Sequence, residues 1–500
     1  MRIREVGRTA LSIAAATTAA GLLALAGLML CAAPGQAAAK LVTLDAPSKS
    51  IDPATQNFQV DPITPSMGVH PGTLKVNVLL PDGYTPTKRY PMLLLYHGAG
   101  ERYDSWIDKD LGDIRNTAAG LNAVIVMPEG AHGFYTNWWN GGQRGNPSWE
   151  DYITNELLPL VESKFSIRPE RRYHAVAGFS MGGYGTWLTG ARMAGFFGTV
   201  VPLSAFASIR DPLVTAVFPI ASGGTPFDSI YGPNTGFYAA AHDPINFGGN
   251  LRYSNLDVYT GNGLPDTGKR PQNGTPTDST SLLLEGVLKT QNDEAVAAMR
   301  AAGNDNVDYT IHAGSHNWEF WRPDLKAAIA KGLFQPVEEH PADWDFVAPS
   351  LTGKAWDIAY RFTVPNTQVV TFSRRGNVLS ATGDGTVEIS DGNGCRFTRT
   401  VPFSKTLASS PCRKLKAGVK GSLKGGKAKK VRVTVTGPDD FGAKGQVDSA
   451  RVWIGKSSAT TSFNGVAMLK VRAKKGTRKV KLVVTKAGYG KVTKVLKVRP

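Results

Sequence analysis

A chain of 500 residues exceeds what one hydrophobic core usually organises, so two or three domains are expected. Hydrophobic residues make up 42% of the chain and aromatic residues 9%, a composition that excludes a disordered protein. The net charge of +17 is unevenly distributed: residues 413–500 hold 24 Lys and Arg against 3 Asp and Glu, which gives this segment +21 and the remainder −4.

The N-terminus has the pattern of a secretory signal peptide. Arginines at three of the first eight positions precede an apolar run over residues 11–30, and small residues follow. We predict a signal peptide over residues 1–39, cleaved near Ala37 to Ala39, and a mature protein that is secreted, extracellular or associated with the cell wall. A retained membrane anchor is the alternative, because the apolar run approaches the length that spans a bilayer.

Apolar strands and helical patterns then alternate up to about residue 348. This alternation is typical of a mostly parallel sheet with helices on both faces. We therefore assign residues 40–348 to one α/β domain. The clearest strand patterns are LKVNVLL (74–80), PMLLLYHG (91–98), AVIVMPEG (123–130) and YHAVAGF (173–179).

The last of these strands runs into Gly178-Phe179-Ser180-Met181-Gly182 and then into a segment able to form a helix. This is the G-x-S-x-G turn in the strand-to-helix context that it requires. Its glycines leave the serine hydroxyl uncrowded, and the tight turn forces strained backbone angles on the serine. We predict that Ser180 is the nucleophile of an acyl-transfer reaction.

A serine hydroxyl becomes an effective nucleophile when a neighbouring imidazole takes its proton. His316 follows the strand pattern DYTIHAG, in a loop at the carboxyl end of that strand, where it can reach the serine. His312, within the strand, and His174 and His242 do not have this placement. We predict His316 as the general base.

The acid should lie between the serine and the histidine in chain order. Asp266, in YTGNGLPD, directly follows a strand, whereas Glu285, in LLLEGVL, opens the next helix. The spacing of these residues does not decide between the two.

Acyl transfer also needs two backbone N–H groups that stabilise the oxyanion. Met181, the residue after the serine, supplies one, and the turn His97-Gly98-Ala99-Gly100 supplies the other through Ala99. An ordinary glycine-rich turn is the alternative interpretation of the second segment.

Residues 349–412 contain short strand patterns with Gly-Asn turns and are predicted to form a small β module. Once the signal peptide is removed, Cys395 and Cys412 are the remaining cysteines, and an oxidising compartment would allow them to form a disulfide. No CxxC motif or Cys/His cluster indicates a metal, so neither a metal nor a cofactor is expected.

The basic segment 413–500 has alternating apolar and polar runs, which predict an immunoglobulin-like β-sandwich. Outward lysines can protect exposed strand edges from aggregation. Alternatively, they can bind an anionic cell-wall polymer or a membrane surface. The sequence leaves both explanations open. It contains no nucleic-acid-binding motif, and nucleic acid is not expected as a partner.

From about Leu74 to Leu333 the chain resembles the esterase D and antigen 85 superfamily of α/β-hydrolases. The segments HGAGERYDSW, MPEG with GFYTNWW, GFSMGG, IYGP followed by HDP, YTGNG, LLLEG and GSHNWEFW occur in the same order as in antigen 85 proteins. The resemblance implies an α/β-hydrolase domain, here followed by small all-β modules that have no counterpart in the core family.

The resemblance also implies roles for individual residues. Mycolyltransferases of this superfamily carry their acid on the helix beyond the GNG strand, and Glu285 matches that position. By the same comparison, Ser180 corresponds to the nucleophile and His316 to the base. Ala99 and Met181 correspond to the residues whose amides bind the oxyanion. One position departs from the pattern: an aspartate that helps to hold trehalose in mycolyltransferases is replaced here by His97.

These observations favour a secreted serine esterase that acts on carboxylic esters, with lipid or acyl-sugar substrates, through an acyl-serine intermediate. An acyltransferase of the mycolyltransferase or diacylglycerol acyltransferase type is the first alternative. The second is a non-catalytic protein that binds the cell envelope, which the basic segment 413–500 suggests.

Overall fold

The computed structural model describes residues 39–51, 74–222, 224–266 and 279–500, and the predicted signal peptide lies outside them except for Ala39. Within the described residues, no helix is long and apolar enough to cross a membrane.

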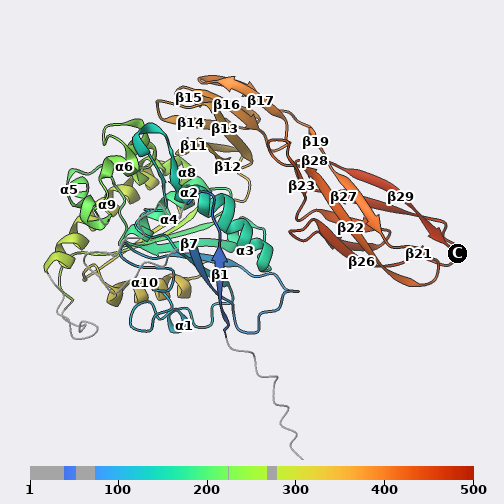
Figure 1. The fold of residues 1–500 in the computed structure, drawn as a ribbon, viewed down its shortest axis with the longest axis horizontal. Helices are drawn as coiled ribbons and strands as arrows, with labels where there is room; N and C mark the ends of the chain where they lie inside the picture. Colours follow the sequence, from blue (N-terminus) through green and yellow to red (C-terminus); the bar gives the residue numbers. More distant parts are fainter. Residues whose placement is uncertain (1–38, 52–73, 223, 267–278) are drawn as a thin grey trace, which may run out of the picture. The chain divides into compact units, whose positions relative to one another are not determined.

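An eight-stranded mixed sheet forms the centre of the N-terminal part (Figure 1). The pairs β1–β2 and β2–β4 are antiparallel, and the remaining pairs are parallel. Along the sheet the order is β1 (Leu41–Ala46), β2 (Leu74–Leu79), β4 (Val124–Pro128), β3 (Met92–Tyr96), β7 (His174–Phe179), β8 (Thr199–Leu203), β9 (Asn255–Gly261) and β10 (Val307–His312).

Helices cover both faces of this sheet because its central strands are apolar on both sides. In β3, Leu94 packs into one hydrophobic cluster and Leu93 and Leu95 pack into the other. Helices α3 (Leu158–Lys164), α4 (Met181–Arg192) and α9 (Ser279–Ala301) cover the first face, and α1 (Ile114–Thr117) and α10 (Trp318–Lys331) cover the second. This arrangement confirms the predicted α/β-hydrolase domain.

Shorter elements lie in the connections between these strands and helices. The helical ones are α2 (Trp149–Asp151), α5 (Pro212–Ala221), α6 (Phe227–Tyr231), α7 (Phe237–Ala241), α8 (Gly248–Leu251), a π-helix at Tyr152–Leu157 and 3-10 turns at Asn140–Gly142, Arg171–Tyr173 and Pro244–Asn246. A two-stranded ribbon joins β5 (Asn137–Trp138) and β6 (Gly145–Ser148).

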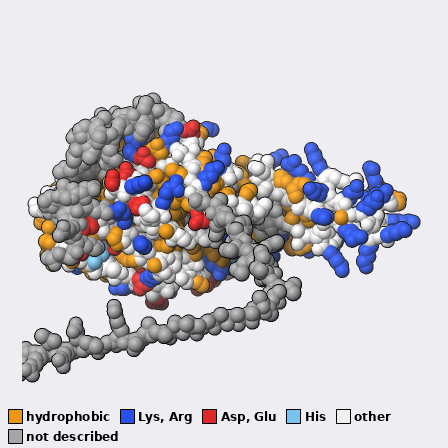
Figure 2. Space-filling view, turned by 90° about the horizontal axis from the view of Figure 1, so that it is seen from below, with side chains coloured by type: hydrophobic (Ala, Val, Ile, Leu, Met, Phe, Trp, Pro, Cys, Tyr) orange, Lys and Arg blue, Asp and Glu red, His pale blue; other side chains and the backbone are white. Residues whose placement is uncertain are grey.

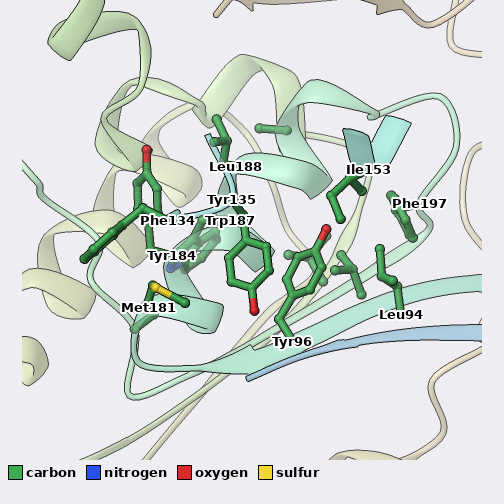
Figure 3. Close-up of a cluster of buried hydrophobic side chains, with 14 of the residues drawn as sticks. Leu94, Tyr96, Phe134, Tyr135, Ile153, Met181, Tyr184, Trp187, Leu188 and Phe197 are labelled. Carbon is green, nitrogen blue, oxygen red and sulfur yellow. The ribbon is translucent and has the colours of Figure 1, made fainter. Parts of the chain in front are cut away.

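The helix after the serine turn is buried along its whole length. Tyr184, Trp187 and Leu188 pack in the cluster that Figure 3 shows, beside the aromatic rings of Tyr96 and Tyr135. Those two rings stack with centroids 4.0 Å apart. Because close-packed interiors resist deformation, α4 gives the residue that precedes it a fixed backbone position.

The first C-terminal module consists of two sheets around one apolar cluster. One sheet is β11 (Asp343–Ala348), β14 (Val370–Arg375), β15 (Val378–Thr382) and β18 (Phe403–Thr406). The other is β12 (Thr352–Ala355), β13 (Ile358–Val364), β16 (Thr386–Ser390) and β17 (Arg396–Thr400).

The start of this module differs from the predicted boundary at residue 349. β11 precedes that residue and pairs with β14, and Trp344 and Phe346 belong to the apolar cluster of the module. The alternation in DWDFVA continues into the module rather than ending the α/β domain, so we propose that the module begins before Asp343. The predicted disulfide between Cys395 and Cys412 is present, with Cα atoms 4.9 Å apart.

The basic segment also forms two sheets around a shared apolar cluster. One sheet contains β20 (Lys416–Lys420), β22 (Ala428–Pro438), β23 (Lys444–Gln446) and β26 (Val466–Arg472), with β22 between β20 and β26. The other runs β21 (Leu423–Lys424), β29 (Val492–Arg499), β27 (Lys479–Thr485), β24 (Arg451–Ile454) and β25 (Ser457–Thr460), and a short ribbon pairs β19 (Arg413–Lys414) with β28 (Tyr489–Gly490).

Candidate active site

Ser180 occupies a strained turn between β7 and α4. Its φ of 56° and ψ of −121° lie in a region that residues with a side chain rarely adopt. Its amide donates to the carbonyl of Leu203 on β8 at 3.0 Å, and its own carbonyl accepts from Tyr184 at 3.0 Å. A Cβ on Gly182 would approach the carbonyl oxygen of His97 to 2.5 Å, so the second glycine of the motif allows close packing against the end of β3.

The structure brings Ser180, His316 and Glu285 together in one hydrogen-bonded line. Nε2 of His316 lies 2.8 Å from Oγ of Ser180, and Nδ1 of His316 lies 2.8 Å from Oε2 of Glu285. The three side chains come from the turn after β7, the loop between β10 and α10, and the second turn of α9. Their contact joins residues that are far apart in the sequence.

Glu285 is fully buried, and its second oxygen is held by three donors. Oε1 accepts from Oγ of Ser204 at 2.6 Å, from Oγ1 of Thr260 at 3.1 Å and from the amide of Gly261 at 2.6 Å. Burial alone would raise the pKa of Glu285, but the hydrogen bond and charge of His316, with donation by Ser204 and Gly261, hold this pKa below its ordinary value. The ionised carboxylate therefore presents Oε2 to His316 as an acceptor.

This environment fixes the tautomer of the histidine. A carboxylate at Nδ1 requires a proton on that nitrogen, which leaves Nε2 of His316 as the acceptor facing the Ser180 hydroxyl. The arrangement can take a proton from the serine as the serine attacks an electrophile.

Asp266, the alternative acid, lies in the segment that follows β9, where it is half-buried. The carboxylate on Nδ1 of His316 is that of Glu285. The strand-end carboxylate is thus not the one that the structure brings to the histidine.

The two predicted oxyanion donors lie at the ends of β3 and β7. Met181 is the first residue of α4, and the first amides of a helix have no partner within that helix. At the other donor, the carbonyl of Gly98 accepts from Nδ1 of His97 at 2.8 Å and from the amide of Glu101 at 3.4 Å. A planar trans peptide directs its N–H opposite to its C=O, so these bonds also fix the direction of the Ala99 amide.

His97 holds the turn that contains the predicted oxyanion donor Ala99, a role that the sequence did not suggest. It is 1% exposed, and its Nε2 accepts from the amide of Gly130 at 2.9 Å while Nδ1 donates to Gly98. Both ring nitrogens are therefore engaged within the protein. The Gly-rich segment around it predicted the turn, but the partner amide of Gly130 comes from the loop after β4 and could not be read from the motif.

Glu101 places a carboxyl group beside the same loop. Burial raises the pKa of Glu101 to about 8, and Nε1 of Trp318 donates to its Oε1 at 2.7 Å. The carboxyl is thus mostly neutral near pH 7, so it adds little negative charge beside the predicted oxyanion donors.

Aromatic side chains pack beside this site, between the sheet and α10. Trp318 and Trp321 are 7% and 6% exposed and pack with Phe179 and Trp106 in the cluster between the sheet and α10. Nε1 of Trp321 donates to Oγ of Ser204 at 3.1 Å, which links this packing to the serine that holds the carboxylate. Ser204 was also missed by sequence analysis, although a polar residue at the carboxyl end of a buried strand is a usable signal.

Within the described ranges, no group of three or more His, Cys, Asp or Glu side chains could hold a metal ion.

Comparison with known proteins identifies relatives of the α/β part. A family model described as "Putative esterase" matches residues 69–331. Esterase Rv1288 from Mycobacterium tuberculosis is 42% identical over 149 residues, which make up 29% of this chain and 32% of that protein. Diacylglycerol acyltransferase/mycolyltransferase Ag85A from Mycobacterium ulcerans is 29% identical over 224 residues, 41% of this chain and 64% of that protein.

Both matches therefore span less than two thirds of the relative's own length. Among solved structures, MPT51 from Mycobacterium tuberculosis is 20% identical with a TM-score of 0.45, and the match covers 60% of this chain and 100% of that one.

Proposed function

Because the chain belongs to the Esterase family, whose model covers residues 69–331, we propose that it hydrolyses carboxylic esters through an acyl intermediate on Ser180. The family and the mycolyltransferase relatives together support an esterase or acyltransferase, in agreement with the predicted superfamily. The observation that carries the proposal is the line of two 2.8 Å hydrogen bonds from Ser180 through His316 to Glu285.

The first half-reaction transfers the acyl group to the serine. Oγ of Ser180 attacks the ester carbonyl carbon while its proton passes to Nε2 of His316, and Glu285 stabilises the imidazolium. The amides of Ala99 and Met181 donate to the oxyanion of the tetrahedral intermediate. When this intermediate collapses, the bond to the alkoxy oxygen breaks, and the imidazolium returns its proton to the leaving alcohol.

The second half-reaction releases the acid. His316 takes a proton from water, the hydroxide attacks the acyl carbon, and the proton then passes to Oγ of Ser180 as the carboxylic acid departs. We propose lipid or acyl-sugar esters as substrates, and an extracytoplasmic location on the basis of the signal-peptide pattern over residues 1–39.

Acyl transfer to a sugar or glyceride hydroxyl is the second candidate, and the similarity to Ag85A favours it. It uses the same acyl-serine and replaces water by an alcohol in the second half-reaction. Product analysis with a lipid ester, with and without an added sugar or glyceride acceptor, separates the two. Free acid as the main product in the presence of acceptor supports hydrolysis, whereas a dominant transfer product overturns it.

Labelling with a fluorophosphonate probe tests the nucleophile itself. We expect the folded protein to be labelled at Ser180, and labelling to disappear in Ser180→Ala. Ser208→Ala is a matched control, because Ser208 is another buried serine of the same domain that lies outside the hydrogen-bonded line. Absence of labelling in the folded wild type would favour the third hypothesis, a non-catalytic envelope-binding protein.

A further inference from the structure

Residues 413–500 carry a basic surface, defined here as the exposed Lys and Arg side chains of this segment. Of its 24 Lys and Arg residues, 22 are exposed, and Arg413 and Lys486 are half-buried. Figure 2 shows many Lys and Arg side chains on the surface of the C-terminal segment, with few acidic side chains among them. Of the three acidic residues of the segment, Asp439 and Asp440 follow the end of β22, and Asp448 lies between β23 and β24.

The charges of the basic surface are not neutralised within the protein. In the described part of the chain, the ion pair formed by a base of this segment is that of Arg413 with Asp440, and none of the 22 exposed bases forms one. The charge of the segment is therefore available to an external partner.

Several of these bases also lie directly opposite one another on neighbouring strands. Like charges in such positions repel and destabilise the sheet. The pairs are Lys420 with Arg432, Lys430 with Lys470, Lys424 with Arg499, and Lys479 with Lys497. A fold that keeps four such pairs, with no intervening acid, retains a repulsion that an anionic ligand would relieve.

Protection of strand edges does not explain every member of this set. Arg432 on β22 is paired on both sides, with Lys420 of β20 and with Met468 of β26. The backbone groups of such an interior position are already paired, so a basic side chain there prevents no edge-to-edge association.

We propose that the basic surface binds a flexible linear polyanion of repeated phosphate groups. The like-charged pairs lie on both sheets: Lys430 and Lys470 project from one, and Lys479 and Lys497 from the other, while Val431 and Leu482 face the shared core. A flat membrane can meet one face of the module, whereas a flexible polymer can follow both. Lysine also predominates among the exposed bases, and lysine binds phosphate as a point charge without the fork geometry of arginine.

The proposal goes beyond the esterase function and does not depend on it. Its test uses the full chain and soluble inorganic polyphosphate as the probe. Binding should weaken steeply with salt, because each neutralised phosphate releases a counterion. The quadruple variant Lys430→Gln, Lys470→Gln, Lys479→Gln and Lys497→Gln should bind at least roughly tenfold more weakly near 0.1 M salt, with a salt slope lower by up to about 3.

A matched variant controls for net charge. Lys88→Gln, Lys109→Gln, Lys164→Gln and Lys326→Gln remove the same charge from exposed positions of the α/β domain and should leave binding unchanged. The unfolding temperature of the first variant should rise, because two like-charged pairs have been relieved. Its turnover of a small soluble ester should not change.

Three results would overturn the proposal. The first is an equal loss of polyphosphate binding in the two quadruple variants. The second is binding to phosphatidylglycerol vesicles without binding to polyphosphate, and the third is binding to a carboxylate polymer such as polygalacturonate in preference to polyphosphate. If the wild-type protein shows no esterase activity, the proposal of polyanion binding still stands. The esterase proposal and the binding proposal can therefore fail separately.

Discussion

Replacing Glu285 by glutamine should reverse the tautomer of His316. In the wild type, the Ser204 hydroxyl, the Thr260 hydroxyl and the Gly261 amide all donate to Oε1 of Glu285. In Glu285→Gln these three donors require the amide oxygen at the same place, so the amide NH₂ faces Nδ1 of His316. Two donors cannot bond to each other, and the imidazole must therefore carry its proton on Nε2, facing the serine.

A histidine in that tautomer cannot accept the proton of Ser180. In a serine protease the equivalent carboxylate-to-amide change lowers kcat about 10⁴-fold, or about 5.5 kcal/mol in barrier height, and we expect Glu285→Gln to lose a similar amount. Initial-rate assays with a p-nitrophenyl ester measure this loss, and thermal unfolding checks that the variant folds.

Asp266→Asn is the matched control, because Asp266 is the other carboxylate that the sequence offered, and it should keep kcat within about threefold of wild type. A Glu285→Gln variant that retains more than about a tenth of the wild-type kcat would refute the tautomer argument, as would an equal loss in Asp266→Asn.

Other changes should have smaller and more specific effects. Ser204→Ala removes a hydrogen bond to a charged carboxylate, worth about 1.5–3 kcal/mol, so kcat for a small ester should fall roughly 10–100-fold while KM stays nearly constant. The pKa of Glu101 near 8 means that this carboxyl ionises beside the oxyanion loop as pH rises, so kcat/KM should fall on the alkaline side through about pH 8, and Glu101→Gln should flatten that limb. Replacing Cys395 and Cys412 by serine opens a loop of sequence separation 17 and should lower unfolding stability by about 3 kcal/mol in denaturant titrations, with activity retained below the transition. Lys430→Gln relieves a like-charged pair and should raise the stability of its module by about 0.2–1 kcal/mol, so an unchanged or lower unfolding temperature would contradict the repulsion argument.

The sequence predicted the architecture where the signal was local. Apolar strands alternating with helices predicted a mostly parallel sheet, and the G-x-S-x-G turn predicted that Ser180 follows a strand and precedes a helix, as it does between β7 and α4. The alternation in Asp343–Ala348 was assigned to the domain before residue 349, because its partner strand, β14, follows later in the chain and cannot be recognised from the segment itself.

The choice between the two acids could not be made from spacing, because it depends on groups from separate elements. Glu285 is held by donors on β9 and at the end of β8, 24 and 81 residues away in the sequence. Only the resemblance to mycolyltransferases favoured this residue beforehand. Those donors explain physically why a carboxylate buried on a helix can remain ionised and orient His316.

The structure of His97 also bears on the acyl acceptor. The resemblance to mycolyltransferases implies that an acceptor-holding aspartate is replaced here by His97, whose side chain is 1% exposed and whose two ring nitrogens are engaged within the protein by Gly98 and Gly130. His97 therefore has no free ring nitrogen to offer a sugar hydroxyl, and it instead supports the turn that contains Ala99. An acceptor alcohol would need to be held by other residues, whereas water needs only access to the acyl carbon and to Nε2 of His316. This difference supports the proposed hydrolysis rather than transfer.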